Sequence, residues 1–408
     1  MERQDEANTQ IIASTVPHPP CATLPQTCPG RFGGLPTAAY VHIPFCRTRC
    51  RYCDFAVTVG TEGLIEKYVR FLLAEIALTP SGGQGLDTVY FGGGTPSLLS
   101  VEQLGRVLTA LREHFGGFAP DAEISLEANP GTFDYKKLTG YRSLGVNRLS
   151  VGVQAFQPHL LALCGRSHRL EDIYSCVATV RAAGFENFNL DLIFGLPHQS
   201  LADWEFSLAE VLRLEPAHLS LYDLILEEET PFGRQFLGGQ APLPGDDDTV
   251  TMYLRACERL QAHGYRQYEI ANFARPGFRC RHNRVYWDNR PYYGIGNGAT
   301  GYVWGARVER PRRLHDYFVW VERGEFPAGA PVLPEEALSD TLLLGLRLLE
   351  GVEVSALVQR FGQPAVARRL AALQSALERG LLILSDGRLR LSVPEGLLLS
   401  NEVFMLLV

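Results

Sequence analysis

The chain has 408 residues, of which 46% are hydrophobic and 20% charged, and its formal net charge is −7. This composition is that of a globular protein with two or three domains, and the acidic balance argues against a nucleic-acid-binding protein, which normally has a surplus of basic residues. No apolar run approaches the ~18 residues that a membrane-spanning helix needs, so we expect no integral membrane segment.

Residues 1–37 predict a disordered, Pro-rich tail. They contain six prolines and show no hydrophobic periodicity, so they cannot bury enough apolar surface to offset the entropy of ordering. The first residues, Met1–Glu6, are acidic and polar, unlike a secretory signal. We therefore expect a cytoplasmic protein with reduced cysteines.

Residues 38–245 predict a partial barrel, because six apolar strand candidates alternate with five amphipathic helical stretches. The strands are expected at Ala39–Ile43, Asp87–Phe91, Ala122–Leu126, Arg148–Val153, Phe188–Phe194 and His218–Tyr222, and the helices near 62–79, 101–115, 134–143, 170–184 and 201–214. This alternation predicts parallel strands joined by right-handed crossovers. The fold class is thus α/β, an incomplete (β/α)6 barrel that is open on one side.

Three cysteines follow the first strand, at the strand ends where β/α barrels carry their functional residues. Cys46, Cys50 and Cys53 form a C-x3-C-x2-C loop. A [4Fe–4S] cluster that only transfers electrons has four cysteine ligands, so three would leave one iron open to a small chelating molecule. This is the motif of radical S-adenosylmethionine (SAM) proteins, and it predicts a cluster with SAM at the open iron. A structural zinc site would need a fourth ligand, and a disulfide framework would suit a small secreted chain.

A glycine-rich loop and a carboxylate follow the next two strands. In Gly92-Gly93-Gly94-Thr95-Pro96 the glycines allow the backbone to approach a ligand closely, and Thr95 adds a hydroxyl group. Glu127 ends the third strand, a position from which carboxylates often bind ribose hydroxyls. The alternative for Glu127 is a solvated loop acid.

Gln154, Arg166 and Asp191 form a second polar set near later strand ends. Asp191 lies in an apolar strand, where an unpaired carboxylate is costly, and Arg166 is the natural candidate for its partner. These residues either form a salt bridge that ties two loops together or bind a ligand.

The C-terminal half predicts two further units. Residues 246–333, with a helix near 247–264 and strand segments around 265–273 and 282–305, are expected to close the open side of the barrel. Residues 334–408 read as a winged-helix-like domain, because helices near 335–350, 353–361 and 364–379 precede two apolar runs joined by Asp386-Gly387, a strong hairpin signal. Winged helices often bind DNA, but this tract has no concentrated basic face.

The segment Cys280–Trp287 carries a second kind of chemistry. It combines His282 with Arg281, Arg284 and two aromatic residues. Arginine forks bind carboxylates and histidine can ligate iron, so the segment could hold a planar, carboxylate-bearing ligand. The alternative for His282 is a structural, hydrogen-bonded role, and His42 is then the next candidate for an iron ligand.

With these motifs in view, the chain from about residue 38 onward resembles the radical SAM family that contains oxygen-independent coproporphyrinogen III oxidase (HemN) and the heme chaperone HemW. The resemblance rests on four motifs: Tyr40–Cys46, Phe91–Ser97, Gly152–Gln154 and Asp191–Pro197. It implies that the first SAM and its cluster contact Tyr40, Tyr52, Gly93, Gly94, Thr95 and Glu127. It also implies that Gln154, Arg166 and Asp191 match residues that hold a second SAM in the oxidase; Ile225 and Thr300 match less clearly.

Three departures from the oxidase favour the HemW branch. Phe55 stands where the oxidase carries a fourth cysteine, and His282–Trp287 has the His-Asn-x-x-Tyr-Trp pattern associated with heme in HemW-like proteins. The oxidase's N-terminal arm is not recognisable in residues 1–37. The resemblance therefore implies a protein that binds heme, a [4Fe–4S] cluster and SAM and delivers heme to hemoproteins, without coproporphyrinogen oxidase activity; a homodimer is left open.

Two other functions compete with this one. The first is the oxidase reaction itself, in which a 5′-deoxyadenosyl radical decarboxylates propionates of coproporphyrinogen III. The second is a structural or DNA-binding winged-helix protein, against which the overall acidity argues.

Overall fold

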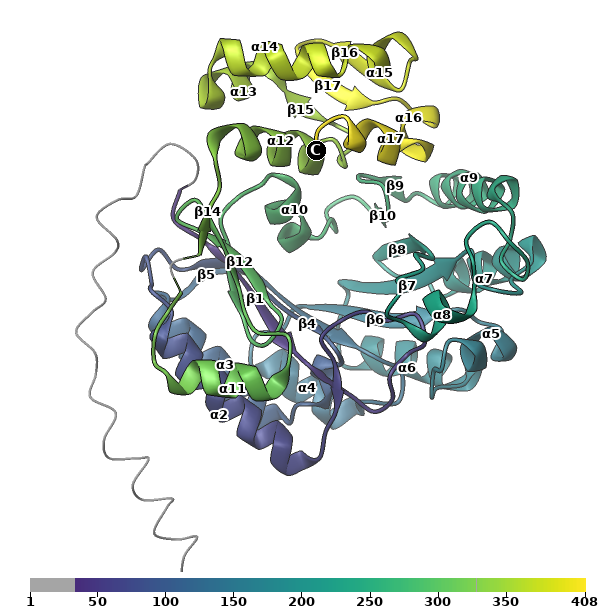
Figure 1. The fold of residues 1–408 in the computed structure, drawn as a ribbon. Coiled ribbons are helices and arrows are strands. Elements are labelled where there is room, and N and C mark those ends of the chain that lie inside the picture. Colours follow the sequence, from purple (N-terminus) through teal and green to yellow (C-terminus); the bar gives the residue numbers. More distant parts are fainter. Residues whose placement is uncertain (1–33, 328) are drawn as a thin grey trace, which may run out of the picture.

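A computed structural model describes residues 34–327 and 329–408 (Figure 1). The predicted tail falls outside the described residues over positions 1–33. No helix in the described part of the chain is long and apolar enough to cross a membrane.

The predicted parallel barrel strands are confirmed. Six parallel neighbours lie in one sheet: β1 (Ala38–Ile43), β4 (Leu86–Gly93), β5 (Phe118–Ala128), β6 (Arg148–Gln154), β7 (Phe188–Phe194) and β8 (His218–Asp223). The predicted helices cover their outer face: α2 (Glu62–Leu78), α3 (Val101–His114), α4 (Tyr135–Ser143), α6 (Leu170–Ala182) and α7 (Leu201–Arg213). The short elements β2 (Phe45–Cys46), β3 (Thr58–Val59), η1 (Pro96–Leu98), α5 (Pro158–Leu163) and α8 (Pro231–Gln235) lie in the connections.

Local signals explain where the helices begin. Ser100 and Ser200 each form a capping box at the start of α3 and α7, accepting a hydrogen bond from the N3 backbone while the N3 side chain bonds back. The strand residues that face the helices are apolar and buried, among them Val41, Val89 and Val151. Because strand side chains alternate between faces, the intervening residues point into the barrel.

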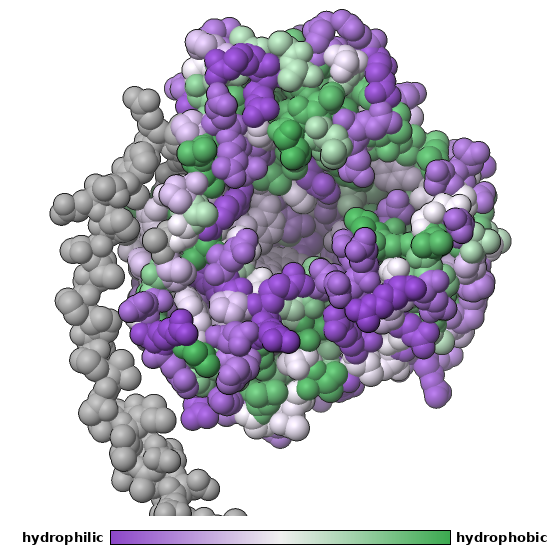
Figure 2. All heavy atoms as spheres, viewed as in Figure 1, coloured by the Kyte–Doolittle hydropathy of each residue, from purple (hydrophilic) through white to green (hydrophobic). Residues whose placement is uncertain are grey.

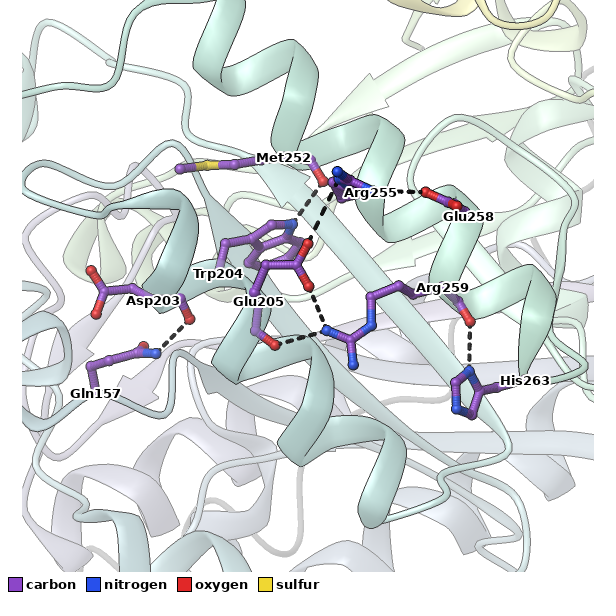
Figure 3. A network of polar contacts seen from close by, with 9 residues as sticks. All are labelled: Gln157, Asp203, Trp204, Glu205, Met252, Arg255, Glu258, Arg259 and His263. Atoms are coloured by element: carbon purple, nitrogen blue, oxygen red, sulfur yellow. Dashed lines mark hydrogen bonds and ion pairs between the residues drawn. The ribbon is translucent and has the colours of Figure 1, made fainter.

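Residues 246–333 extend the barrel sheet at both of its edges, partly through elements other than those predicted. Helix α9 (Asp246–Ala262) packs on α7: Trp204 Nε1 donates to the Met252 carbonyl at 2.7 Å, and Arg259 pairs with Glu205 at 2.5 Å (Figure 3). Beyond α9, β10 (Asn272–Ala274) adds antiparallel to β8, and β9 (Arg266–Gln267) pairs with β10.

The expected strand segment 282–305 is wrong in its first part. Arg281–Trp287 forms helix α10. Its first two backbone N–H groups, those of Arg281 and His282, each donate to the Glu123 carboxylate at 3.0 Å. A carboxylate from β5 thus accepts the hydrogen bonds of the free N–H groups at the start of this helix. Because Glu123 is about 160 residues away in the chain, the local sequence does not reveal it as a partner.

The rest of this segment reaches the other edge of the sheet. β11 (Tyr293–Ile295) pairs in parallel with β1, so residues 265–295 contribute strands at both ends of the nine-stranded order β11-β1-β4-β5-β6-β7-β8-β10-β9. A small sheet follows, formed by β12 (Thr300–Val303), β13 (Ala306–Glu309) and β14 (Ala330–Pro331), with α11 (Leu314–Glu322) between β13 and β14.

The C-terminal residues form their own hydrophobic core above α10 in Figure 1. The elements are α12 (Pro334–Gly345), β15 (Val352–Glu353), α13 (Val354–Phe361), α14 (Gln363–Ala372), α15 (Gln374–Glu378), β16 (Leu382–Ser385), β17 (Arg388–Leu391), α16 (Glu395–Leu398) and α17 (Ser400–Met405). The predicted hairpin is present, and its turn residue Asp386 has a φ of +52°. The helix expected over 364–379 is broken at Leu373, and α16 and α17 were not expected.

Candidate functional site

A cavity of about 520 Å³ lies at the carboxyl ends of the barrel strands. It brings together most of the residues singled out from the sequence: Cys46, Cys50, Tyr52, Cys53, Gly93, Gly94, Thr95, Glu127, Gln154, Arg166 and Asp191, with Ile225 at one side. Tyr40, His42, His282 and Thr300 are not among its lining residues. We call this space the rim cavity.

The three motif cysteines face the rim cavity as unpaired, partly buried thiols. The Thr95 hydroxyl donates to Cys46 Sγ at 3.6 Å, and Arg166 Nη1 donates to Cys50 Sγ at 3.4 Å. Burial raises the pKa of Cys46 to about 11 and also raises the pKa of Cys53. Thiols in such a place become thiolates when a metal displaces their protons.

The donor set fits an iron–sulfur cluster better than a single ion. In the described part of the chain no three His, Cys, Asp or Glu side chains converge closely enough to hold one metal ion. A [4Fe–4S] cluster needs no such convergence, because each thiolate binds a different iron of the cube. The three thiols come from one loop at the cavity, and Thr95 and Arg166 donate to two of their sulfur atoms, as side chains around a metal site commonly do.

The glycine loop lies directly against the cysteine loop. Gly94 N donates to the Ile43 carbonyl at 2.8 Å, and Thr95 N donates to the Phe45 carbonyl at 2.7 Å. A Cβ atom at Gly94 would lie 2.7 Å from that Phe45 oxygen, and Gly93 has a φ of +109° with the His42 ring 2.5 Å from a Cβ position. The glycines are therefore required by chain-to-chain packing that positions Cys46, as well as lining the cavity.

Glu127 is not a solvated loop acid. Its two carboxylate oxygens accept from Gly93 N at 3.0 Å and from the Tyr90 hydroxyl at 2.9 Å. Burial raises the pKa of Glu127 to about 7, and the nearby Asp191 carboxylate adds to the shift. Each oxygen can accept a further hydrogen bond, so the group can receive ribose hydroxyls from the cavity side.

The expected partnership between Arg166 and Asp191 is wrong. Arg166 Nη2 donates to Asn129 Oδ1 and to the Gly152 carbonyl, each at 2.5 Å. Asp191 instead accepts from Asn189 Nδ2 at 2.6 Å and from the Ser150 hydroxyl at 3.4 Å. Arg166 is held by the loop after β5 and by the backbone of β6, whereas Asp191 is held by side chains on the inner face of the sheet.

Gln154 and Asn129 complete this side of the cavity. Gln154 has a φ of +74°, where β6 changes register against β7; a non-glycine residue in this conformation is strained, as is common at binding sites. Asn129 Nδ2 donates to Thr95 at 2.9 Å, so Asn129 connects the glycine loop with Arg166. Its place after the third strand was visible in the sequence, but its role as a bridge was not.

Neither of the histidines considered as iron ligands lines the rim cavity, and both ring nitrogens of each are hydrogen-bonded. His282 is fully buried, with Nδ1 2.8 Å from the Thr88 hydroxyl and Nε2 2.8 Å from the Tyr286 hydroxyl. Burial lowers its pKa to about 3, so the ring is neutral. His42 lies between the Tyr40 hydroxyl at 3.0 Å and the Ala56 carbonyl at 2.9 Å.

The expectation that Arg281 and Arg284 flank a ligand beside His282 is wrong. Arg281 pairs with Asp121 at 3.1 Å, and Arg284 pairs with Glu350 at 2.7 Å and with Asp288 at 3.2 Å. In a helix, residues at consecutive positions point in different directions. His282 therefore points into the barrel, and the two arginines point to its outside.

Known proteins resemble this chain over most of its length. Residues 40–211 match the family model of the radical SAM superfamily, and residues 332–399 match that of the HemN C-terminal domain. The chain is 44% identical to the heme chaperone HemW of Synechocystis sp. over 395 residues, covering 90% of this chain and 95% of that protein. It is 36% identical to the heme chaperone HemW of Bacillus subtilis over 371 residues, covering 90% and 98%.

Among solved structures, coproporphyrinogen III oxidase (HemN) from Escherichia coli, a radical SAM enzyme, superposes with a TM-score of 0.79 at 25% sequence identity. The match covers 93% of this chain and 91% of that structure. The shared fold thus extends over the barrel, its closing segment and the C-terminal domain.

Proposed function

The chain belongs to the HemW family of the radical SAM superfamily, and on that premise we propose that it is a heme chaperone. It would bind a [4Fe–4S] cluster, SAM and heme and deliver the heme to hemoproteins. The observation that carries the proposal is the rim cavity, which brings three free cysteines together with the residues expected to bind SAM: Tyr52, Gly93, Gly94, Thr95 and Glu127. Phe55, which is 63% exposed, borders the same cavity in place of a fourth cysteine.

The residues for the cluster and SAM are assigned from their contacts. Cys46, Cys50 and Cys53 would hold the cluster, with Thr95 and Arg166 donating to sulfur. A cluster held by three cysteines supplies an open iron that can chelate the amino and carboxylate groups of SAM. The glycine loop and Glu127 would then face the rest of SAM, with the Glu127 carboxylate accepting ribose hydroxyls.

Heme would lie on the inner face of the sheet, beside the aromatic residues that surround His282. Tyr90 stacks on the His282 ring with centroids 5.3 Å apart, and Tyr286 packs edge-on against Tyr292 at 4.8 Å. We propose that His282 contributes to heme binding either by ligating iron, once the Tyr286 hydroxyl moves from Nε2, or by holding these rings in place. Free thiols in the described residues suit a reducing compartment, and we propose that the protein acts in the cytoplasm.

One experiment separates this function from the oxidase reaction, which would use the same residues to bind SAM. Protein reconstituted anaerobically with iron and sulfide would be tested in parallel for heme retention and for loss of carboxyl groups from coproporphyrinogen III. We expect retained heme, measured by its Soret absorbance, and no decarboxylation with SAM and a reductant present. Steady formation of protoporphyrinogen IX would overturn the chaperone function.

A further inference from the structure

The inner face of the barrel sheet is polar well below the rim cavity. Strand register aligns Ser125 with Arg148, Ser150 with Asn189, and Asn189 with His218, and paired residues share a face. We call the inward-facing residues of the amino-terminal halves of the strands the barrel base: Thr88, Glu123, Arg148, Asn189 and His218.

Most of the barrel base is paired. His218 Nδ1 lies 2.7 Å from Asn189 Oδ1 and its Nε2 lies 2.7 Å from the Tyr268 hydroxyl. Thr88 bonds His282, and Glu123 accepts from the first two N–H groups of α10 and from the Cys280 thiol at 3.6 Å. These groups are satisfied by the fold itself.

Arg148 is different. Its side chain is 2% exposed, and its Nε has no hydrogen-bond partner. Across residues 34–327 and 329–408 none of its side-chain nitrogens makes an ion pair or hydrogen bond, although seventeen ion pairs occur elsewhere. Glu123, the carboxylate that could neutralise it, is committed to α10.

A charged side chain in this position is costly unless something binds it. Burial acts to lower the pKa of Arg148, but Cys280, Glu123, Tyr90 and Tyr268 together raise it above its ordinary value. Arginine does not lose its proton in proteins, so the guanidinium remains a buried cation whose donors have no hydrogen-bond or ion-pair partner among the described residues.

Arg148 itself does not line the rim cavity, but the same inner face of the sheet extends from Arg148 to that cavity. Ser150, two residues further along β6 and so about 7 Å nearer the rim, lines the rim cavity. Tyr222 on β8 is 44% exposed, and Figure 2 shows the viewed face hollowed at its centre. Tyr40 stacks on Tyr90 at 6.3 Å between centroids, so the aromatic side chains around His282 continue sideways from β4 to β1.

We propose that the Arg148 guanidinium binds a carboxylate of the planar ligand carried in the barrel, a heme propionate if the function proposed above holds. Arg148 thereby takes the part first expected of Arg281 and Arg284, whose guanidiniums are held by Asp121 and Glu350 outside the barrel. The aromatic side chains near His282 (Tyr40, Tyr90, Tyr286 and Tyr292), which we call the aromatic wall, favour a flat ligand. The buried, unpaired Arg148 favours a ligand that carries a negative charge at its edge.

The test compares three probes: hemin, hemin dimethyl ester, which lacks both carboxylate charges, and iron-free protoporphyrin IX, which keeps them. Affinities would be measured by quenching of tryptophan fluorescence in full-length protein and in the variants Arg148→Gln, Arg148→Lys and Arg281→Gln. The unmodified protein should bind hemin and protoporphyrin IX roughly 10- to 100-fold more tightly than the ester, which is the range of a charge-assisted hydrogen bond.

Arg148→Gln should abolish that preference and leave the affinity for the ester unchanged, and Arg148→Lys should retain part of it. Arg281→Gln should behave as the unmodified protein. Because an unpaired buried charge is removed, Arg148→Gln should keep or raise the melting temperature, whereas loss of a structural arginine would lower it. If Arg148→Gln fails to fold, the partial loss of the preference in Arg148→Lys serves as the test.

A full preference for carboxylate-bearing probes in Arg148→Gln would overturn the inference. If SAM binding were weakened in the same variant, the anion bound by Arg148 would instead be the carboxylate of SAM. Failure of the proposed function would look different, because the unmodified protein would then bind none of the three probes.

Discussion

The rim cavity and the barrel base lie on the same inner face of one sheet, yet they are built in different ways. At the rim, most of the side chains come from the carboxyl-terminal parts of strands and the loops that follow them, and the cysteine loop, the glycine loop and Asn129 hold one another through backbone and side-chain contacts. At the base, the side chains lie within strands, and register decides which ones meet. A site of the first kind can be read from motifs, whereas one of the second kind depends on long-range pairing.

The strongest test of the rim is removal of a thiol. Replacing Cys46, Cys50 or Cys53 by alanine should abolish the iron–sulfur absorbance after reconstitution, because no other cysteine of the described residues lines the cavity to replace the lost ligand. Iron and acid-labile sulfide would be measured per chain. Cys176→Ala is the matched control, since Cys176 is buried in α6 away from the cavity lining, and it should keep a full cluster. A triple alanine variant that still held four irons would contradict the assignment.

The next test asks whether the glycine loop positions the cysteines. Gly94→Ala should lower the free energy of unfolding by about 1–3 kcal/mol and reduce cluster incorporation, because the new Cβ meets the backbone of Pro44 and Phe45 at 2.7–2.9 Å. Chemical denaturation and iron content would be measured together. Gly63→Ala, in α2 with nothing within 4 Å of the new Cβ, should be neutral or slightly stabilising. Equal effects of both changes would contradict the packing role.

A third pair of variants separates the two roles of His282. His282→Ala should weaken heme retention by roughly 10-fold and shift the Soret band while leaving the iron–sulfur spectrum unchanged. Tyr286→Phe removes the hydroxyl bonded to Nε2, so it should strengthen heme binding if that nitrogen ligates iron. If the histidine only holds the aromatic wall, Tyr286→Phe should leave the Soret position unchanged.

The smallest expected effect is the pH dependence of SAM binding. The pKa of Glu127 is raised to about 7, so the carboxylate that accepts ribose hydroxyls is lost as the pH falls through that value. SAM affinity should therefore rise up to about tenfold between pH 6 and pH 8, as measured by calorimetry on reconstituted protein. Glu127→Gln should bind SAM more weakly and without this dependence; a variant with the original pH profile would assign the titration to another group.

Much of the fold was predictable because its signals are local. The period of apolar residues located the six barrel strands and the helices between them to within a few residues, and Asp386-Gly387 marked the hairpin. Helix α10 was missed because its N-terminus is satisfied by Glu123 of β5 rather than by a nearby capping side chain. The break at Leu373 and the short helices α16 and α17 likewise lacked a strong local signal.

The sequence by itself determined which residues stand at the strand ends, since parallel strands bring those ends to one rim wherever the helices cover the other face. That was enough to group the three cysteines with Gly93, Glu127, Gln154 and Asp191. Only the tertiary structure decided the partners. Arg166 bonds Asn129 rather than Asp191, His282 faces inward while Arg281 faces out, and Arg148 is left without an anion. Hydrogen bonds and ion pairs act over about 3–4 Å, and distances that short are set by register and packing across the chain.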